Sequence, residues 1–556
     1  MRRGSGAPLA LLCCLPPSLA NAHGFGERYD LPAPLGYFVA GAAATVTLSF
    51  VVAIVAVRRD RPHALQTVSI GLPDGLRPVA LAVRGLVLAL FLLVIAAGLW
   101  GDAHPAKNIA PTVVWILGWV GFSLFAALVA NLWPAVDPWA SLHCLVDRGR
   151  ARKPWPAAWG SKPAVLLFLL FAWFEVVDPL ASRPSHLALI LIAWTVVNVS
   201  GMVRYGREAW QRHADPLAIY FETLGRFAPL GLHGARLVVR PWARALVALP
   251  PTAPTAFIIA MLATVLFDGL LGTQLWRRID TALATFAPGL NDRDNVVIGT
   301  AGLLVTIALF LVAYRIACAI TAALAKGHAA TRVADLFAPT LVPIAVAYLV
   351  AHNLTYLLVQ GQGIVPLLSD PFGRGWNLFG TAGFTPDIGF VDARFNWYAA
   401  TTAIVAGHVI SVWLAHRVAL QAWPASRRAI VASLPLTVVM IGYTAVSLSV
   451  VAEPLTRYRT PDPTYSSAPE GGSAAVVGLR LLHFARLQVP DDRCSKLSFL
   501  NGEAVAFGAI GVGDSAIVLA GTDTRRDVLG LVFIASTTTH DDSPVSAYIN
   551  DIVLHK

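Results

Sequence analysis

Long runs of apolar residues alternate with shorter polar segments along most of the chain. Each run is close to the roughly 20 residues that a helix needs to cross about 30 Å of hydrocarbon. The runs predict ten transmembrane helices, at residues 35–57, 79–100, 110–131, 163–181, 187–203, 254–272, 296–317, 333–359, 397–416 and 428–452. The expected fold class is therefore an all-α integral membrane protein.

Arg and Lys are shared unequally between the two sets of connecting segments. If the N-terminus lies outside, 23 of them fall in the inner segments and seven in the outer ones. Basic residues concentrate on the cytoplasmic side of membrane proteins. The asymmetry predicts a multi-pass protein of the bacterial inner membrane with both termini in the periplasm.

The first residues have the pattern of an export signal. Arg2 and Arg3 precede an apolar run at 7–15, and Ala20-Asn21-Ala22 offers the small residues that a signal peptidase requires. Residues 1–22 are thus predicted to be a cleaved signal peptide, leaving His23 as the first residue. An N-terminal histidine resembles the copper chelate of several periplasmic proteins, so His23 is a candidate metal ligand; the alternative is an arbitrary first residue.

Composition narrows the class of protein further. Of the 556 residues, 56% are hydrophobic and 13% are charged, which excludes a soluble multidomain enzyme. The net charge of +10 is explained by the inner basic segments facing anionic lipid headgroups, so the expected partner is the lipid bilayer and no nucleic acid is implied.

Three regions depart from a simple series of spans. Residues 205–250 mix aromatic and basic residues, which suits amphipathic helices on the cytoplasmic surface; the alternative is a plain surface connector. Residues 360–396 form a Gly- and aromatic-rich outer loop, either a lid or pocket wall or a plain covering loop. Residues 23–453 are the expected helical membrane domain, and residues 454–556 a periplasmic linker and a small tail, β-prone or disordered.

Candidate chemistry lies in the few ionisable residues inside the spans, because such groups in hydrocarbon usually face a cavity, a partner or a pathway. Glu175 and Asp178 share one face of the fourth span, and Asp268 lies in the outer half of the sixth. His352 lies in the outer third of the eighth span, and His408 near the middle of the ninth. All except His408 belong to the periplasmic half, which predicts a polar cavity open to the outside.

These residue types suit a metal or proton-handling site. His352 and His408 are candidate ligands for a divalent transition metal together with Asp268, and Glu175 or Asp178 is a candidate general base. The alternative is that each residue makes an interhelical hydrogen bond with no further role. The chain lacks a GxSxG elbow, an HExxH pair, a Walker lysine loop and a CxxCH haem site.

Several segments resemble one family of bacterial polytopic membrane proteins. They are HGFGERYDLPAPLGYFVAGAAATVTLSFVV from residue 23, TVLFDGLLGT from 264, AHNLTYLLVQGQ from 351, SDPFGRGWNLFGTAGF from 369 and IVAGHVISVWLAHRVAL from 404. In this order they are similar to the family labelled fenitrothion hydrolase, a membrane-bound organophosphate hydrolase subunit. The resemblance covers about residues 23–452.

The resemblance implies hydrolysis of an organophosphorothioate triester, a small apolar substrate, by this chain alone or with a second membrane subunit. It assigns no catalytic residue, although the resembling segments contain His23, Asp268, His352 and His408. A bound metal would supply an activated water and stabilise charge on phosphorus.

Two other classes of function fit the same residues. In a transporter or a metal (copper)-handling protein, they would line a permeation or delivery path from an outward-facing cavity. In a scaffold subunit, they would support helix packing for a partner protein.

Overall fold

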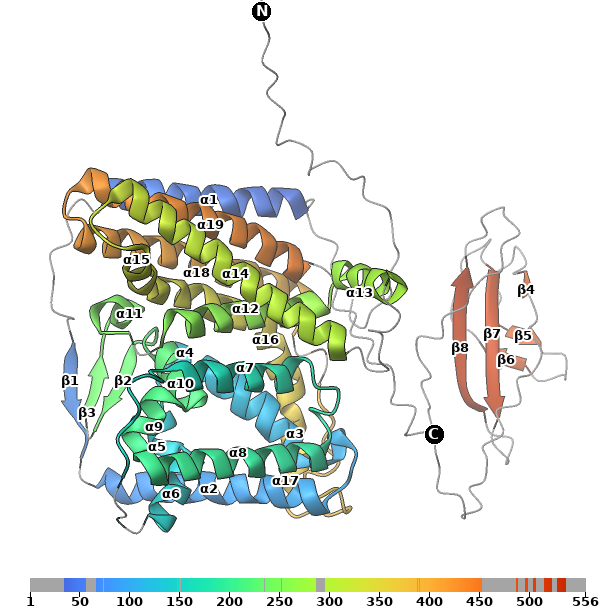
Figure 1. Ribbon diagram of the computed structural model, residues 1–556. Coiled ribbons are helices and arrows are strands. Elements are labelled where there is room, and N and C mark those ends of the chain that lie inside the picture. Colours follow the sequence, from blue (N-terminus) through green and yellow to red (C-terminus); the bar gives the residue numbers. More distant parts are fainter. Residues whose placement is uncertain are drawn as a thin grey trace, which may run out of the picture. The chain divides into compact units, whose positions relative to one another are not determined.

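The chain divides into two units in a computed structural model, Met1–Arg457 and Tyr458–Lys556 (Figure 1). The structure describes residues 35–452, apart from 57–66, 74, 148, 150–151, 235, 252, 287–295, 388 and 390, and five strands between 487 and 536. The predicted signal peptide and His23 lie outside the described residues.

The first unit is helical and apolar enough to be embedded in a membrane. Eight helical stretches in its described part are long and apolar enough to cross one: Leu35–Ala56, Leu76–Trp100, Ile109–Leu128, Pro184–Tyr205, Val296–Ala325, Ala330–Ser369, Arg394–Ala422 and Arg427–Ala452. A ninth is counted if Thr255–Leu271 and Gln274–Leu283, which meet at 84°, form one span. The structure therefore supports a multi-pass protein.

The labelled elements follow these stretches. Five are single helices: α1 (Leu35–Ala56), α2 (Leu76–Trp100), α8 (Pro184–Tyr205), α14 (Val296–Ala325) and α19 (Ser426–Ala452). Two stretches combine several elements. The stretch Ile109–Leu128 consists of α3 (Ile109–Pro111), η2 (Thr112–Gly121) and α4 (Phe122–Leu128). The stretch Ala330–Ser369 consists of α15 (Ala330–Phe337), η4 (Ala338–Leu341), α16 (Val342–Gln360), η5 (Gly361–Gly363) and α17 (Ile364–Ser369). The eighth is α18 (Ala393–Ala422).

Two predicted spans are shorter than expected. Helix α7 (Lys162–Val176) has 15 residues and α12 (Thr255–Leu271) has 17. At 1.5 Å per residue they measure about 22 and 25 Å, less than the roughly 30 Å of hydrocarbon. After α12 the chain bends into α13 (Gln274–Phe286), which carries charged residues.

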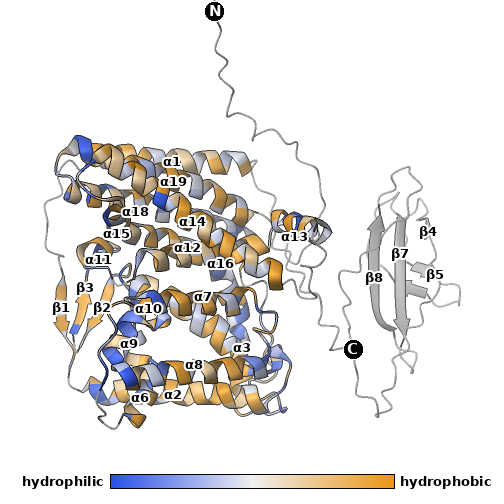
Figure 2. Ribbon diagram, viewed as in Figure 1, coloured by the Kyte–Doolittle hydropathy of each residue, from blue (hydrophilic) through white to orange (hydrophobic). Residues whose placement is uncertain are grey.

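Burial separates outer helices from central ones. Only 6% of the apolar stretch of α2 and 11% of that of α14 is buried inside the protein. In the stretch that contains α16, 83% is buried. Leu81 and Leu86 of α2 are exposed in the protein, and Figure 2 shows the hydrophobic colouring along α2, α8 and α14. Such apolar surfaces need lipid around them.

The helices pack in groups around α12 and α16. Helix α19 packs against α1, α14 and α18, and α1 also packs against α18, whereas α2 packs against α8 (Figure 1). Helix α16 packs against α12, α18 and the η2 segment, and α7 packs against α12. The central position of α12 and α16 is what brings their polar residues together.

The prediction of surface amphipathic helices at 205–250 is wrong for most of the segment. It contains α9 (Arg207–His213), α10 (Pro216–Gly225), the strands β2 (Leu230–His233) and β3 (Arg236–Val239), and α11 (Arg244–Ala248). Strand β3 pairs antiparallel with β2 and with β1 (Val68–Gly71), so Val238 lies opposite Gly231 and Ser69.

Tertiary packing explains this difference. Phe221 is buried, with its ring centroid 4.8 Å from those of both Phe122 and Trp133. Leu224 and Phe227 are buried as well. The sequence pattern places these aromatic residues at the lipid interface, but in the structure they pack beside α4. Burying an aromatic ring removes a large apolar area from water, and the mutual orientation of two rings adds further stabilisation.

Arg240 shows how a basic residue of this segment becomes buried. Its Nε donates to the Ala228 carbonyl at 3.1 Å and its Nη2 donates to the Gly225 carbonyl at 2.6 Å. Carbonyl groups beyond the end of a helix lack intrahelical donors, so the guanidinium satisfies them. The residue ties the end of β3 to the end of α10.

Arg240→Met is expected to lower the free energy of unfolding by about 1.5–3 kcal/mol, because two carbonyls lose a charged donor. The midpoint of thermal unfolding of the detergent-purified protein measures this loss. Arg236→Met is the matched control, because exposed Arg236 donates to the Ser69 hydroxyl at 2.8 Å and not to a buried carbonyl. Equal midpoints for the two variants would contradict the assigned role.

The second unit contains short strands. They are β4 (Leu487–Gln488), β5 (Lys496–Ser498), β6 (Ala504–Ala506), β7 (Ser515–Thr522) and β8 (Val528–Ser536). Strand β7 pairs antiparallel with β4 and β8, and β5 with β6. Strands β7 and β8 coincide with the β-prone runs AIVLAG and LGLVFIAS.

Candidate functional site

Asp268 of α12 and His352 of α16 form a hydrogen-bonded pair. The distance from His352 Nε2 to Asp268 Oδ2 is 2.8 Å, and the two side chains are 9% and 19% exposed. A carboxylate oxygen only accepts, so His352 Nε2 carries the hydrogen and Nδ1 remains the acceptor of the neutral ring. The structure thus joins two of the candidate residues, 84 positions apart in sequence.

Gly269 allows the two helices to approach at this point. A Cβ atom added to Gly269 would lie 2.4 Å from the Tyr348 hydroxyl oxygen. Tyr348 is buried and stacks on His352, with ring centroids 6.1 Å apart. Helix spacing puts Tyr348 and His352 on one face of α16, where the tyrosine ring holds the imidazole against α12.

His408 is buried in α18 and belongs to a different local environment. Its Nδ1 lies 2.8 Å from the Ile404 carbonyl oxygen, so Nδ1 carries the hydrogen and Nε2 is the acceptor. Nε2 is buried without a hydrogen-bond partner among the described residues. The ring centroid of Tyr443 in α19 is 5.7 Å away.

The two remaining carboxylates have other partners. Asp178 Oδ2 lies 2.7 Å from His186 Nε2, and Asp178 Oδ1 accepts from the Leu180 amide at 2.9 Å. Glu175 accepts a hydrogen bond from the Trp119 indole. Glu175 and Asp178 are three residues apart in sequence, but their carboxyl groups bind different partners.

The expected metal site is not assembled in the part of the chain that the structure describes. There, no group of three or more His, Cys, Asp and Glu side chains lies close enough to hold a metal ion. His352 and Asp268 pair with each other, and His408 does not complete a triad with them. His408 Nδ1 bonds the backbone of its own helix, and its ring lies near Tyr443 of α19.

Several residues of these contacts, His186, Tyr348 and Tyr443 among them, are not predicted by the sequence pattern. His186 lies eight positions after Asp178, Tyr348 lies one turn before His352, and Tyr443 lies in the last predicted span. The spacing of Tyr348 and His352 was a usable signal, because residues four apart meet on a helix face. His186 and Tyr443 required knowledge of helix packing.

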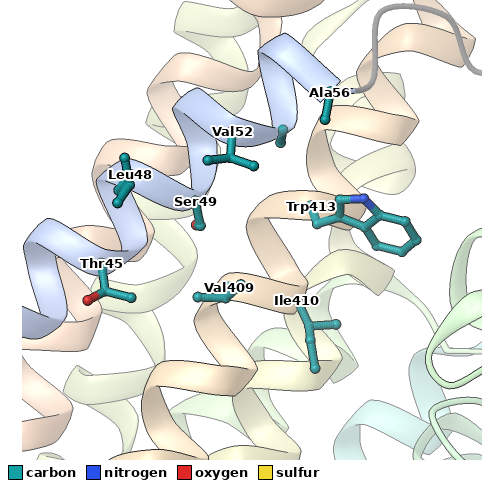
Figure 3. A pocket seen from close by; sticks show the side chains of 9 residues that line it. Thr45, Leu48, Ser49, Val52, Ala56, Val409, Ile410 and Trp413 are labelled. Atoms are coloured by element: carbon teal, nitrogen blue, oxygen red, sulfur yellow. The ribbon is translucent and has the colours of Figure 1, made fainter.

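An apolar groove lies beside α18, the helix that carries His408. It has a volume of about 660 Å³ and is lined by residues of α1 and α18: Thr45, Leu48, Ser49, Val52, Ala53, Ala56, Val409, Ile410 and Trp413 (Figure 3). The Thr45 and Ser49 hydroxyls donate to the Gly41 and Val46 carbonyls of their own helix, which leaves the groove little polar character.

The loop after α17 has a defined turn. Asp370 Oδ1 accepts from the Arg374 amide at 2.9 Å, and Oδ2 accepts from the Gly375 amide at 2.6 Å. The Arg374 guanidinium donates to the Trp100 carbonyl at 3.1 Å and lies over the Phe372 ring. These contacts assign Asp370 and Arg374 to loop structure.

Comparisons with protein-family models, with curated proteins and with solved structures found no match to this chain.

Proposed function

We propose that this chain is a membrane-bound hydrolase component acting on organophosphorothioate triesters similar to fenitrothion. The observation that carries the chemistry is the 2.8 Å hydrogen bond between Asp268 and His352. The resemblance of the segments around these two residues supports the substrate class. The native substrate is then a small, apolar phosphotriester-like ester.

The pair can supply general-base catalysis. His352 Nδ1 accepts a proton from water as the water oxygen attacks phosphorus, and the nitrophenolate leaves with the electron pair of its bond to phosphorus. Asp268 holds the imidazole in the required tautomer and stabilises the imidazolium that forms. In this scheme His352 is the catalytic residue and Asp268 positions it.

Ten spans with both termini in the periplasm fit this proposal. The short helices α7 and α12 would complete the eight longer stretches, and the distribution of Arg and Lys supports the orientation. In that arrangement Asp268 and His352 belong to the periplasmic half. An apolar substrate would reach the bundle through the outer leaflet.

The test is fenitrothion turnover by membranes from a host that expresses this chain, measured as nitrophenol release. We expect release above that of empty-host membranes, and a loss of about 10²-fold or more for His352→Gln at matched abundance. His186→Gln is the control, because it removes a histidine from an equally short His–Asp contact. Absence of release from abundant wild type, with and without a co-expressed second subunit, would refute the proposal.

The second candidate is a proton- or metal-coupled transporter. It is favoured by His408, whose buried Nε2 has no partner among the described residues and whose ring lies near Tyr443. Vesicles containing the chain would then show proton or copper flux without nitrophenol release. Flux lost in His408→Gln, with turnover absent in every variant, would place transport ahead of hydrolysis.

A further inference from the structure

The apolar groove between α1 and α18 is open at the surface of the first unit. Leu48 and Val52 of its α1 wall are 62% and 55% exposed in the protein. Ser49 and Val409 stand on opposite walls (Figure 3). None of the described residues that line the groove is charged. An exposed apolar surface of this kind marks a contact with lipid or with another protein.

The two helices that form the groove run in the same direction. Phe38 of α1 packs on Trp397 of α18, with ring centroids 5.3 Å apart. Further along both helices, Phe50 packs on His416, with ring centroids 6.3 Å apart. The C-terminal ends of α1 and α18 therefore lie at the same end of the pair. The groove lies toward this end, because it extends to the last residue of α1.

A guanidinium group lies at this end of the groove. The guanidinium carbon of Arg417 is 4.9 Å from the ring centroid of Trp413, which lines the groove on α18. Trp413 and Arg417 are four residues apart, so they share one face of the helix. The groove thus joins an apolar surface to a positive charge.

The spacing of charges along α18 places Arg417 near a membrane surface. The helix has no Lys, Asp or Glu, and its other arginine is Arg394. The interval between the two arginines measures about 34 Å at 1.5 Å per residue, close to the roughly 30 Å of hydrocarbon. Arg394 lies over the Tyr398 ring, as Arg417 lies over Trp413. Tyr and Trp at the two ends of a span are typical of the membrane–water interfaces.

The groove has the length of one lipid chain. Its α1 wall, from Thr45 to Ala56, measures about 16 Å, which is about half of the hydrocarbon thickness and therefore one leaflet. Its volume of about 660 Å³ falls in the range of roughly 300–1,000 Å³ that is usual for small-molecule sites. An acyl chain that enters the hydrocarbon beside Trp413 would extend along the whole groove.

We propose that the groove between α1 and α18 binds an anionic phospholipid, with one acyl chain along its apolar walls and the phosphate group on Arg417. The guanidinium donates N–H hydrogen bonds to the phosphate oxygens, and ionised partners make such bonds strong. An apolar helix of a partner protein would also cover the walls, but it brings no anion to the Arg417 end. A phospholipid supplies the chain and the anion together.

Native mass spectrometry of the full chain in detergent measures the headgroup preference. We expect dioleoyl phosphatidylglycerol to bind about fivefold more tightly than dioleoyl phosphatidylcholine, because one arginine near the membrane surface contributes about that factor. Arg417→Gln should bring the ratio close to one, whereas Arg417→Lys keeps a preference. Arg394→Gln is the matched control, because it removes the same group from beside an aromatic ring at the other end of α18. It should keep the wild-type ratio.

Photo-crosslinking in vesicles locates the acyl chain. A phosphatidylglycerol with a diazirine in the middle of one chain should label peptides of α1 and α18 more than the exposed faces of α2 and α14. Ser49→Phe fills the groove and should reduce this labelling severalfold. Thr47→Phe is the matched control on the same helix, because Thr47 does not line the groove and its hydroxyl also bonds a carbonyl of α1, that of Ala43, at 2.8 Å.

The labelling pattern of the wild-type protein needs no variant to fold. Equal labelling of α1, α2 and α14 would overturn the proposal, because it indicates lipid without a fixed site. Equal affinity of the wild type for the two lipids would overturn it as well, and so would equal losses of preference in Arg417→Gln and Arg394→Gln. A photo-crosslinker attached through Ser49→Cys that captures a second protein and no lipid would assign the groove to a partner helix instead.

Discussion

Asp268→Asn is expected to reduce turnover by about 10²- to 10⁴-fold while the protein remains abundant in the membrane. The asparagine oxygen can still accept a hydrogen bond from His352 Nε2, so the packing of α12 on α16 is retained. The neutral amide no longer stabilises an imidazolium ion. The rate of nitrophenol release per molecule of folded protein measures the effect.

This variant separates catalysis from structure. If Asp268 serves only helix packing, Asp268→Asn keeps the wild-type abundance and the wild-type turnover per folded molecule. His186→Gln controls for the loss of a partly buried His–Asp contact elsewhere. Wild-type turnover in Asp268→Asn would remove the pair from the mechanism.

Gly407→Ala is expected to destabilise the protein by about 1–3 kcal/mol, because overpacking forces neighbouring backbones apart. A Cβ atom at Gly407 would lie 2.4 Å from Ala347 Cβ and 2.6 Å from the Pro343 carbonyl oxygen. Both neighbours are on α16, and neither is a flexible chain end. The midpoint of thermal unfolding in detergent should fall by several degrees.

Gly442→Ala provides the matched control in α19. A Cβ atom there meets no atom within 4 Å, and alanine favours a helix over glycine by up to about 1 kcal/mol. Its midpoint should therefore equal or exceed that of wild type. If both variants unfold at the wild-type midpoint, the close approach of α16 and α18 is not maintained in the membrane protein.

The candidate site was predictable as a set of residues but not as a set of contacts. The position of ionisable residues within apolar runs of the sequence identified the candidates Glu175, Asp178, Asp268, His352 and His408. The pairing of Asp268 with His352 and of Asp178 with His186 depends on which helices are neighbours, and helical periodicity within one segment carries no such information.

Residues 205–250 show the same limit for the fold. Their mixture of Phe, Leu and Arg is compatible with a helix at a lipid surface, and hydropathy cannot distinguish it from a segment folded into the protein. The buried ring of Phe221 and the backbone carbonyls that bind Arg240 decide between the two.

The sequence by itself determined that the chain is a multi-pass helical membrane protein. A run of about 20 apolar residues is a local property, and as a helix it is stable in the hydrocarbon of a bilayer wherever it lies in the chain. Tertiary structure alone decided that Asp268 meets His352 and that the predicted metal triad is not formed in the described residues. These contacts join residues far apart in the chain, and they depend on close packing at positions such as Gly269 and Gly407.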